Sequence, residues 1–76
     1  MKKIGFRIKE LAATKGRRDG ERISYADIHE ATGISPNSLS MLATGKSKHV
    51  GISTIERLLD YFECGVGELI EVCDSD

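Results

Sequence analysis

The segment Thr32-Gly33-Ile34-Ser35-Pro36 places the end of one helix directly before the start of the next. Gly33 follows a helical apolar pattern, and glycine takes the left-handed conformation that ends a helix at the least cost. Ser35 is a preferred N-cap, and Pro36 suits the first helical position because the amide it lacks would be unpaired there. The sequence therefore predicts two consecutive helices joined by a very short turn.

Capping signals define the outer limits of this pair. Ser24 can cap the first helix, and Asp27 three residues later completes a capping box. Gly45 follows the last apolar residue of the second helix and can end it. A helix-turn-helix motif is thus expected over about residues 24–45, with the second helix at about residues 35–44.

The N-terminal part of the chain also has a helical apolar period. Ile4, Ile8 and Leu11 follow an i, i+4, i+7 pattern, which predicts a first helix that ends near Lys15-Gly16. The next segment, Gly16 to Arg22, contains charges and two glycines but no apolar residue. We expect it to be a loop.

The C-terminal part predicts two more helices. A capping box at Ser53–Glu56 indicates a fourth helix that runs to a stop at Cys64-Gly65, and residues 66–72 can form a short fifth one. We found no strand alternation or internal repeat. The expected fold is all-α: a compact five-helix bundle with a central helix-turn-helix, in a single domain spanning residues 1–76.

The formal net charge of −1 conceals a polarised chain. Residues 1–49 carry ten Lys or Arg against five Asp or Glu, whereas residues 50–76 carry one against seven. Such asymmetry favours one anion-facing side, although a solvated charge pattern without functional meaning is the alternative.

Several classes of function lack the residues they require. Cys64 and Cys73 are too few for a disulfide framework and do not have the spacing of a redox pair or a zinc site. His29 and His49 have no catalytic constellation around them, so we expect no enzyme, no cofactor and no metal. No apolar stretch approaches the length of a membrane span, and charged residues interrupt the apolar run that a signal peptide would need. We expect a reducing, cytoplasmic location.

The second helix of the motif has two contrasting faces. Leu39 and Leu42 share one face, with Ala43 beside them, and should be buried. A purely solvated opposite face would more often use Lys and Glu. Short, uncharged hydrogen-bonding groups instead suit the DNA major groove, where each base pair presents a distinct set of donors and acceptors. The opposite face carries Asn37, Ser40, Met41 and Thr44.

The stretch ISYADIHEATGISPNSLSMLATGK, with IGFRIKEL before it and GISTIERLLDYFECGVGELIE after it, resembles the phage-repressor-like (XRE-type, Cro-like) helix-turn-helix domains, especially their small stand-alone bacterial members. The resemblance covers nearly the whole chain. It implies a lambda-repressor-like DNA-binding fold and a transcriptional regulator. It also implies that the helix beginning at Ser35 is the recognition helix.

The residue pattern and the resemblance together define the expected contacts. In the family, a glutamine at the first position of the bracing helix often touches the DNA backbone; here Tyr25 stands there, with a hydroxyl that can donate to phosphate. The loop after the recognition helix contributes phosphate contacts in the family. We expect base contacts from Asn37, Ser38, Ser40, Met41 and Thr44, and DNA backbone contacts from Ser24, Tyr25, Pro36, Lys46, Ser47, Lys48, His49, Arg17 and Arg18.

Three features depart from the family pattern. Ala12 and Ala43 replace a common arginine–glutamate pair, and exchange of both partners of a buried pair for apolar residues can be neutral. His29 stands where alanine usually lies at the close approach of the two motif helices. It is either a neutral packed ring or a contact or pH-sensitive residue. The basic loop from Gly16 to Arg22 is either a DNA contact or a plain mobile loop.

The expected partner is a double-stranded DNA operator. Because the contact stripe lacks arginine and lysine, one domain offers modest readout, so we expect a homodimer on a palindromic site. The candidate dimer surface is the fifth helix with Ile70 and Val72 and the neighbouring Tyr61 or Phe62. The alternative is a protein-interaction or antitoxin-like accessory module that uses the Met41 stripe for a protein partner. The sequence implies no small-molecule ligand.

Overall fold

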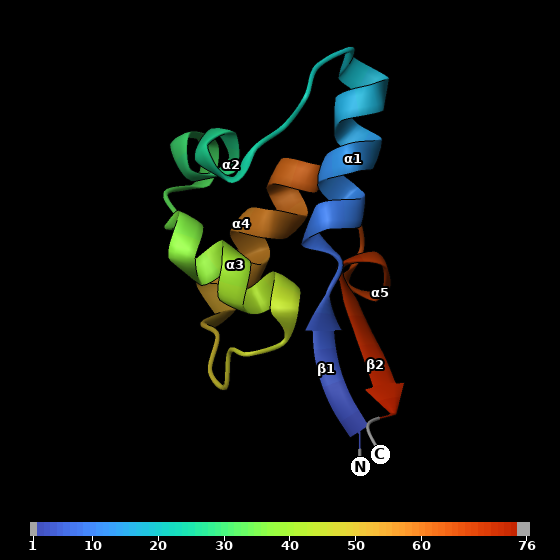
Figure 1. The fold of residues 1–76 in the computed structure, drawn as a ribbon, viewed down its shortest axis with the longest axis vertical. Helices are drawn as coiled ribbons and strands as arrows, with labels where there is room; N and C mark the ends of the chain where they lie inside the picture. The colour runs from blue at the N-terminus through green and yellow to red at the C-terminus, as the bar shows by residue number, and fades with distance from the viewer. Residues whose placement is uncertain (1, 75–76) are drawn as a thin grey trace.

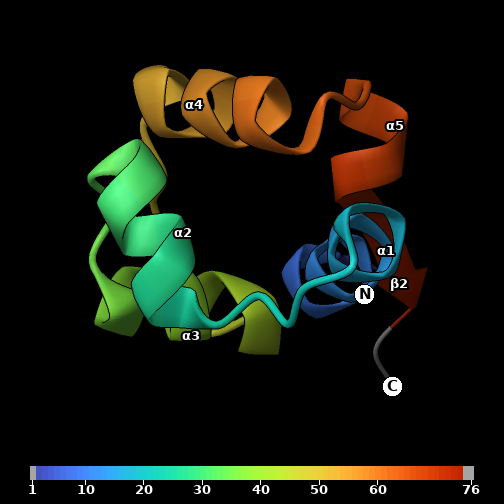
Figure 2. The same ribbon diagram turned by 90° about the horizontal axis from the view of Figure 1, so that it is seen from above.

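The core receives side chains from each of the five helices within residues 2–74. The computed structural model describes residues 2–74, and Figure 1 shows the arrangement of their helices and strands. Seen from above, the helices surround the core as a ring (Figure 2). The elements in chain order are β1 (Lys2–Phe6), α1 (Ile8–Asp19), α2 (Tyr25–Thr32), α3 (Pro36–Thr44), α4 (Ile52–Phe62), α5 (Val66–Leu69) and β2 (Ile70–Asp74).

The helix-turn-helix prediction is confirmed. Ser24 caps α2, and its backbone N–H and its hydroxyl both bond the carboxylate of Asp27, which completes the capping box. Gly33 ends α2 in the left-handed conformation, with φ of 79°, and Ser35 then caps α3. Gly45 ends α3 in the same conformation. Local capping chemistry therefore determines both helices of the motif.

The prediction of an all-α fold is wrong in one respect. Residues Lys2–Phe6 form a strand that pairs antiparallel with Ile70–Asp74, and Ile4 lies opposite Val72 in this two-stranded sheet. Ile4 therefore does not belong to the first helix, and residues 70–72 do not belong to the fifth. The two strands are separated by the rest of the chain, so no local apolar period could reveal their pairing.

The boundaries of α1 also differ from the prediction. The helix continues through Gly16 to Asp19 and ends at Gly20, which has φ of 72°. Gly16 is buried inside it, where a Cβ would collide with the carbonyl oxygen of Glu21. The glycine serves close packing of the following loop rather than termination, so the expected loop over residues 16–22 is shorter than predicted.

The limits of α4 also differ from the prediction. The helix begins at Ile52 after Gly51, which offers no side-chain cap, so the predicted capping box at Ser53–Glu56 is absent. It ends at Phe62, where Glu63 takes the left-handed conformation in place of the expected stop at Cys64-Gly65. Apolar burial of Leu58 and Phe62 therefore determines where this helix lies.

Candidate nucleic-acid interface

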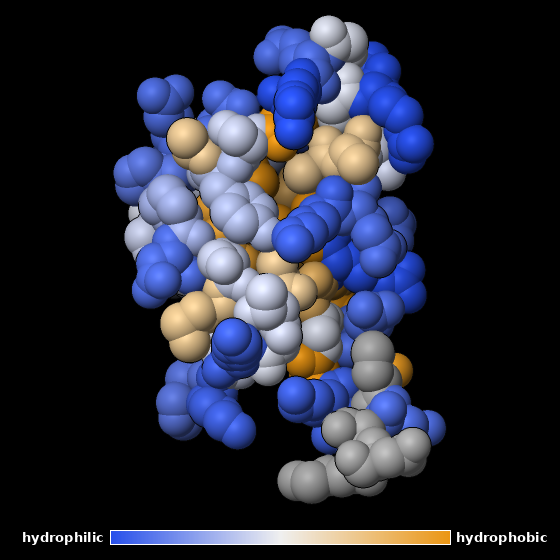
Figure 3. Space-filling model, in the orientation of Figure 1, coloured by the Kyte–Doolittle hydropathy of each residue, from blue (hydrophilic) through white to orange (hydrophobic). Residues whose placement is uncertain are grey.

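The outer face of α3 is exposed along its whole length. Leu39 and Leu42 on its inner face are 0% and 3% exposed, so the helix is held by its back against the core. Figure 3, drawn in the orientation of Figure 1, shows pale, weakly polar residues across the middle of the molecule, with strongly hydrophilic residues around them. All five residues expected to contact bases lie exposed: Asn37, Ser38, Ser40, Met41 and Thr44.

The hydrogen bonds of α3 decide which of these groups are free to bind a ligand. The hydroxyl of Ser35 donates to Ser38 Oγ at 2.9 Å, and that of Thr44 donates to the carbonyl of Ser40 at 2.9 Å. Ser38 and Thr44 are therefore partly engaged within the helix. The side chains of Asn37 and Ser40 make no hydrogen bond within residues 2–74, which leaves their donors and acceptors available.

The loop after α3 is basic and is tied to the end of that helix. The backbone N–H groups of Lys46 and Ser47 donate to the carbonyl of Met41 at 3.0 and 3.3 Å, and Ser47 Oγ donates to the carbonyl of His49 at 2.8 Å. Lys46, Lys48 and His49 are exposed. Their cationic or polar ends thus flank the α3 face at a defined position.

The N-terminus of α2 is less open than the sequence suggested. The hydroxyl of Ser24 accepts from the N–H of Asp27 and donates to its carboxylate, so its hydrogen is already used. The hydrogen bonds that Ser24 gives through its backbone N–H and its hydroxyl hold the pKa of Asp27 below its usual value. An ionised carboxylate therefore sits where a phosphate was expected, and it repels anions.

Tyr25 also departs from its expected role. Its side chain is half-buried against the core, and its hydroxyl is fully buried with no hydrogen-bond partner among the described residues. A phosphate cannot reach that hydroxyl in this arrangement. The prediction that it donates to the DNA backbone does not fit the structure, because the ring of Tyr25 packs inward instead of standing on the surface.

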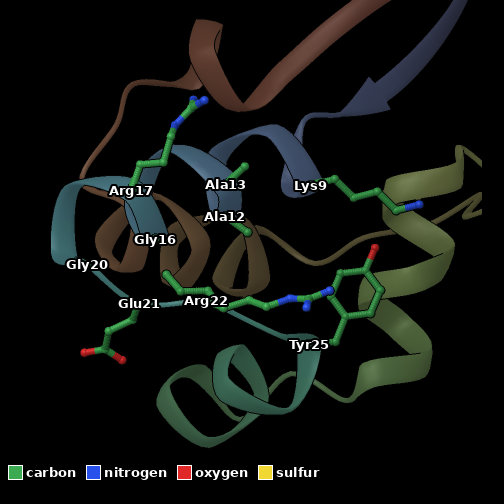
Figure 4. A pocket seen from close by; sticks show the side chains of 10 residues that line it. Lys9, Ala12, Ala13, Gly16, Arg17, Gly20, Glu21, Arg22 and Tyr25 are labelled. Atoms are coloured by element: carbon green, nitrogen blue, oxygen red, sulfur yellow. The ribbon is translucent and has the colours of Figure 1, made fainter.

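Two further cations lie near Tyr25: Lys9, which the sequence analysis did not place in the site, and Arg22, from the loop for which a DNA contact was one of two alternatives. Lys9 from α1 and Arg22 from the α1–α2 loop line a hollow of about 590 Å³ together with Tyr25, and in Figure 4 Arg22 extends toward the tyrosine ring while Lys9 extends toward α3. Both are exposed. Their positive charge was visible in the sequence, but their position beside the motif depends on how α1 packs.

The remaining basic candidates lie farther from α3. Arg17 and Arg18 belong to the last turn of α1, at the top of Figure 1, whereas α3 lies lower in the same view. Arg18 lies 3.4 Å from a carboxylate oxygen of Glu63 and 3.5 Å from one of Asp19. Arg18 is therefore already paired, while Arg17 makes no ion pair within the described part of the chain.

The departures from the family pattern have simple structural outcomes. Ala12 is buried and Ala43 packs against the core, so small apolar side chains occupy the place of the missing ion pair. His29 turns outward and is exposed, and its Nδ1 lies 3.0 Å from the carbonyl of Ile34. Because a carbonyl only accepts, Nδ1 must carry the proton. The ring thereby links the end of α2 to the start of the turn.

Residues 2–74 contain no group of three His, Cys, Asp or Glu side chains arranged to hold a metal ion. Over the same residues, every helix is too short or too polar to span a bilayer. Burial raises the pKa of the Cys64 thiol, with the nearby Glu68 contributing, which agrees with a packing role for this side chain. The side chain of Cys73 lies outside the described part of the chain.

Comparison with known proteins agrees with this geometry. The sequence profile of the Cro/C1-type HTH DNA-binding domain matches residues 7–75. The chain belongs to this family. It is also similar to YozG, an uncharacterised HTH-type transcriptional regulator of Bacillus subtilis (strain 168), with 34% identity over 50 residues that cover 66% of this chain and 60% of that protein. No solved structure is significantly similar to the chain.

Proposed function

We propose that this member of the Cro/C1-type family is a sequence-specific, double-stranded-DNA-binding transcriptional regulator, and not an enzyme. The observation that carries the proposal is the exposed outer face of α3, where Asn37 and Ser40 keep free donors and acceptors while Leu39 and Leu42 anchor the helix from behind. Helix α3 enters the major groove and reads base edges. The proposal includes the cytoplasmic location expected from the sequence, because the protein would act on DNA there.

The proposed contacts divide into contacts to base edges and contacts to the phosphate backbone. At the base edges, the amide of Asn37 can bond adenine with both of its polar atoms, Met41 can contact a thymine methyl group, and the hydroxyls of Ser38, Ser40 and Thr44 add shorter contacts. Each good base contact contributes about 1–3 kcal/mol of discrimination. With no arginine or lysine on the face, the sequence preference of one domain is modest.

The proposed contacts to the phosphate backbone come from residues on either side of α3. On one side are Pro36 at the start of the helix and the loop residues Lys46, Ser47, Lys48 and His49; on the other are Lys9 and Arg22. Arg17 extends this second side along the duplex. The proposal leaves out Arg18, which is paired with Glu63, and the hydroxyls of Ser24 and Tyr25, which are engaged or buried. Neutralised phosphates supply most of the affinity.

A homodimer on a palindromic operator completes the proposal. Two copies on half-sites about one helical turn apart add the modest readout of each α3. Selection of bound duplexes from a random pool, followed by footprinting, tests the function directly. A symmetric consensus protected by the protein is the expected result. Recovery of unrelated sequences with no protected footprint would contradict the proposal.

The salt dependence of binding gives a second test. We expect the double variant Lys46→Ala, Lys48→Ala to bind the selected duplex more weakly and to reduce the slope of log K against log salt by roughly 1 for each lost phosphate contact. Arg18→Ala is the matched control, because it removes one exposed cation that is already paired. An equal change of slope in both variants would show that the loop has no special role.

The alternative function, a protein-interaction or antitoxin-like module, has one observation in its favour. Met41 is 39% exposed and lines a hollow of about 420 Å³ between α3 and α4 that could receive an apolar side chain of a protein partner. Such binding depends little on salt, in contrast to phosphate contacts. A steep salt dependence of the interaction supports the DNA proposal, and a flat one supports the protein partner.

A further inference from the structure

The hollow beside Tyr25 combines an apolar lining with two cations. It lies between α1 and the loop that leads to α2, and its volume of about 590 Å³ is typical of small-molecule sites. The side chains of Lys9 and Arg22 both extend to the side of the hollow on which Tyr25 lies (Figure 4). The apolar lining consists of Ala12, Ala13, Ile23 and the ring of Tyr25.

The close approach of the loop to α1 at Gly16 gives the hollow its shape. Gly16 is buried in α1, and its carbonyl accepts a hydrogen bond of 2.8 Å from the N–H of Glu21. Since a Cβ at position 16 would collide with the carbonyl oxygen of Glu21, only glycine allows this approach. The loop residues that follow, Arg22 and Ile23, are thereby held across from α1.

The positive charge of the hollow has no internal counter-ion. Neither Lys9 nor Arg22 makes an ion pair within residues 2–74. Glu21 and Arg17 also line the hollow, but in Figure 4 both side chains point away from Tyr25. A guanidinium binds a carboxylate through two parallel N–H groups, and a lysine adds a second positive charge. The arrangement therefore favours an anion.

The apolar lining indicates what else the occupant contains. A DNA phosphate would satisfy the cations but has no apolar part to cover Ala12, Ala13 and Ile23. An aromatic carboxylate has both parts: its ring can pack against the lining and against Tyr25 while its carboxylate faces Lys9 and Arg22. Burial of the ring removes apolar surface from water and adds to the affinity.

We propose that this hollow is an effector site for a small amphipathic carboxylate with an aromatic body. The sequence implied no small-molecule ligand, because the lining residues are spread over positions 9–25 and only the fold brings them together. The inference rests on the proposed function for its consequence alone. Lys9 and Arg22 are also proposed phosphate contacts, so a bound carboxylate would occupy them and weaken the binding of DNA.

Titration of the isotope-labelled full chain with sodium benzoate, without DNA, tests the site. We expect saturable changes in the amide NMR signals of Ala12, Gly16 and Ile23, with a dissociation constant of about 1 mM or lower. Benzamide, which has the ring without the charge, should bind about tenfold more weakly, and acetate, which has the charge without the ring, should give no saturable change. Equal effects of benzoate and acetate, or no saturation with benzoate, would overturn the proposal.

A matched pair of variants locates the carboxylate. Arg22 lines the hollow, whereas Arg18 lies on the same helix end outside it and is paired with Glu63. We expect Arg22→Gln to bind benzoate about tenfold more weakly and to lose the preference for benzoate over benzamide, and Arg18→Gln to keep both. Circular dichroism verifies folding of both variants. Equal losses in the two variants would contradict the proposed position of the carboxylate.

The consequence for DNA is measured with the selected duplex. Benzoate should raise the dissociation constant for DNA about tenfold relative to the same concentration of acetate, which matches the ionic strength. Benzoate binding without any change in DNA affinity would overturn the effector role. A chain that binds the duplex but not benzoate defeats this inference alone, whereas a chain that binds benzoate but no duplex defeats the proposed function alone.

Discussion

The N-termini of α2 and α3 are built on the same plan but differ in what they can bind. Each is capped by a serine that accepts the N–H of the third helical residue: Ser24 from Asp27, and Ser35 from Ser38. In α2 that third residue is an acid, whose carboxylate also bonds the backbone of Ser24. In α3 it is a neutral serine, and the first turn contains no acidic residue.

The two helix ends therefore differ in the charge of their first turn. The partial positive charge at a helix N-terminus attracts anions, but an acid within the first turn neutralises it. The N-terminus of α2 is therefore satisfied internally. The first turn of α3 has no such acid, which supports its proposed position beside the phosphates that border a major groove.

Introducing the acid of α2 into α3 should have the largest effect on binding. In Ser38→Asp, a carboxylate completes a capping box like that of α2, so the helix should be stabilised or unchanged. The same carboxylate would bring a negative charge into the proposed base-contacting face, close to the acceptors of the base edges and to the DNA phosphates, and we expect affinity for the selected duplex to fall about a hundredfold. Ser38→Asn is the matched control without the charge. Equal affinities of the two variants, measured by anisotropy titration, would refute the role given to this helix end.

Removal of the cap of α2 should lower the stability of the protein and leave its DNA affinity almost unchanged. In Ser24→Ala, the N–H of Asp27 loses its acceptor, and the free energy of unfolding should fall by about 1 kcal/mol. Affinity for DNA should stay within about twofold at temperatures where the variant is folded, since the hydroxyl has no part in the proposed contacts. Urea denaturation and DNA titration measure the two quantities. A loss of DNA affinity in Ser24→Ala without a loss of stability would instead indicate that the Ser24 hydroxyl contacts DNA.

The buried hydroxyl of Tyr25 offers a smaller effect in the stabilising direction. A buried polar group without a partner costs free energy, so Tyr25→Phe should raise the free energy of unfolding by up to about 1 kcal/mol. DNA affinity should be unchanged. If the phenylalanine variant instead binds DNA more weakly with unaltered stability, the hydroxyl reaches the phosphate backbone, as the resemblance to the family implied.

The acid of α2 also predicts the smallest effect, a dependence of stability on pH. Because its hydrogen bonds lower the pKa of Asp27 in the folded state, the unfolded chain binds the proton more readily. This contribution to stability is complete above the ordinary pKa of an aspartate and is lost as the pH falls through the lower, folded value. As the pH falls, the free energy of unfolding should decrease less steeply in Asp27→Asn than in wild type. Thermal unfolding between pH 2 and 6, on the order of the aspartate pKa range, measures it.

Prediction from the sequence succeeded for the helix ends of the helix-turn-helix, which neighbouring residues determine, but failed for the capping box expected at Ser53–Glu56. Ser24, Gly33, Ser35 and Gly45 act within one helical turn of where they stand, so their chemistry is readable locally. It failed where distant residues decide. Ile4 was assigned to a helix because it lies four residues before Ile8, but pairing with Val72 places it in a strand.

The candidate site divides in the same way. The outward face of α3 follows from helical periodicity, and its exposure was predicted from Leu39 and Leu42. The inward turn of Tyr25, and the positions of Lys9 and Arg22 beside it, depend on how α1 packs against α3 and α4, which no local pattern encodes. The assignment of Gly16 as a stop failed because its role is to admit the backbone of Glu21.

The pairing of β1 with β2 also affects the order in which the chain can become structured. Residues 2–6 precede every helix of the described chain in the sequence, whereas their strand partner, residues 70–74, follows every one of them. The helix-turn-helix can therefore be organised while the first strand is still single. Pairing of β1 with β2 requires both ends of the described chain, so we expect deletion of residues 70–74 to remove the sheet while the capping bonds of α2 and α3 remain.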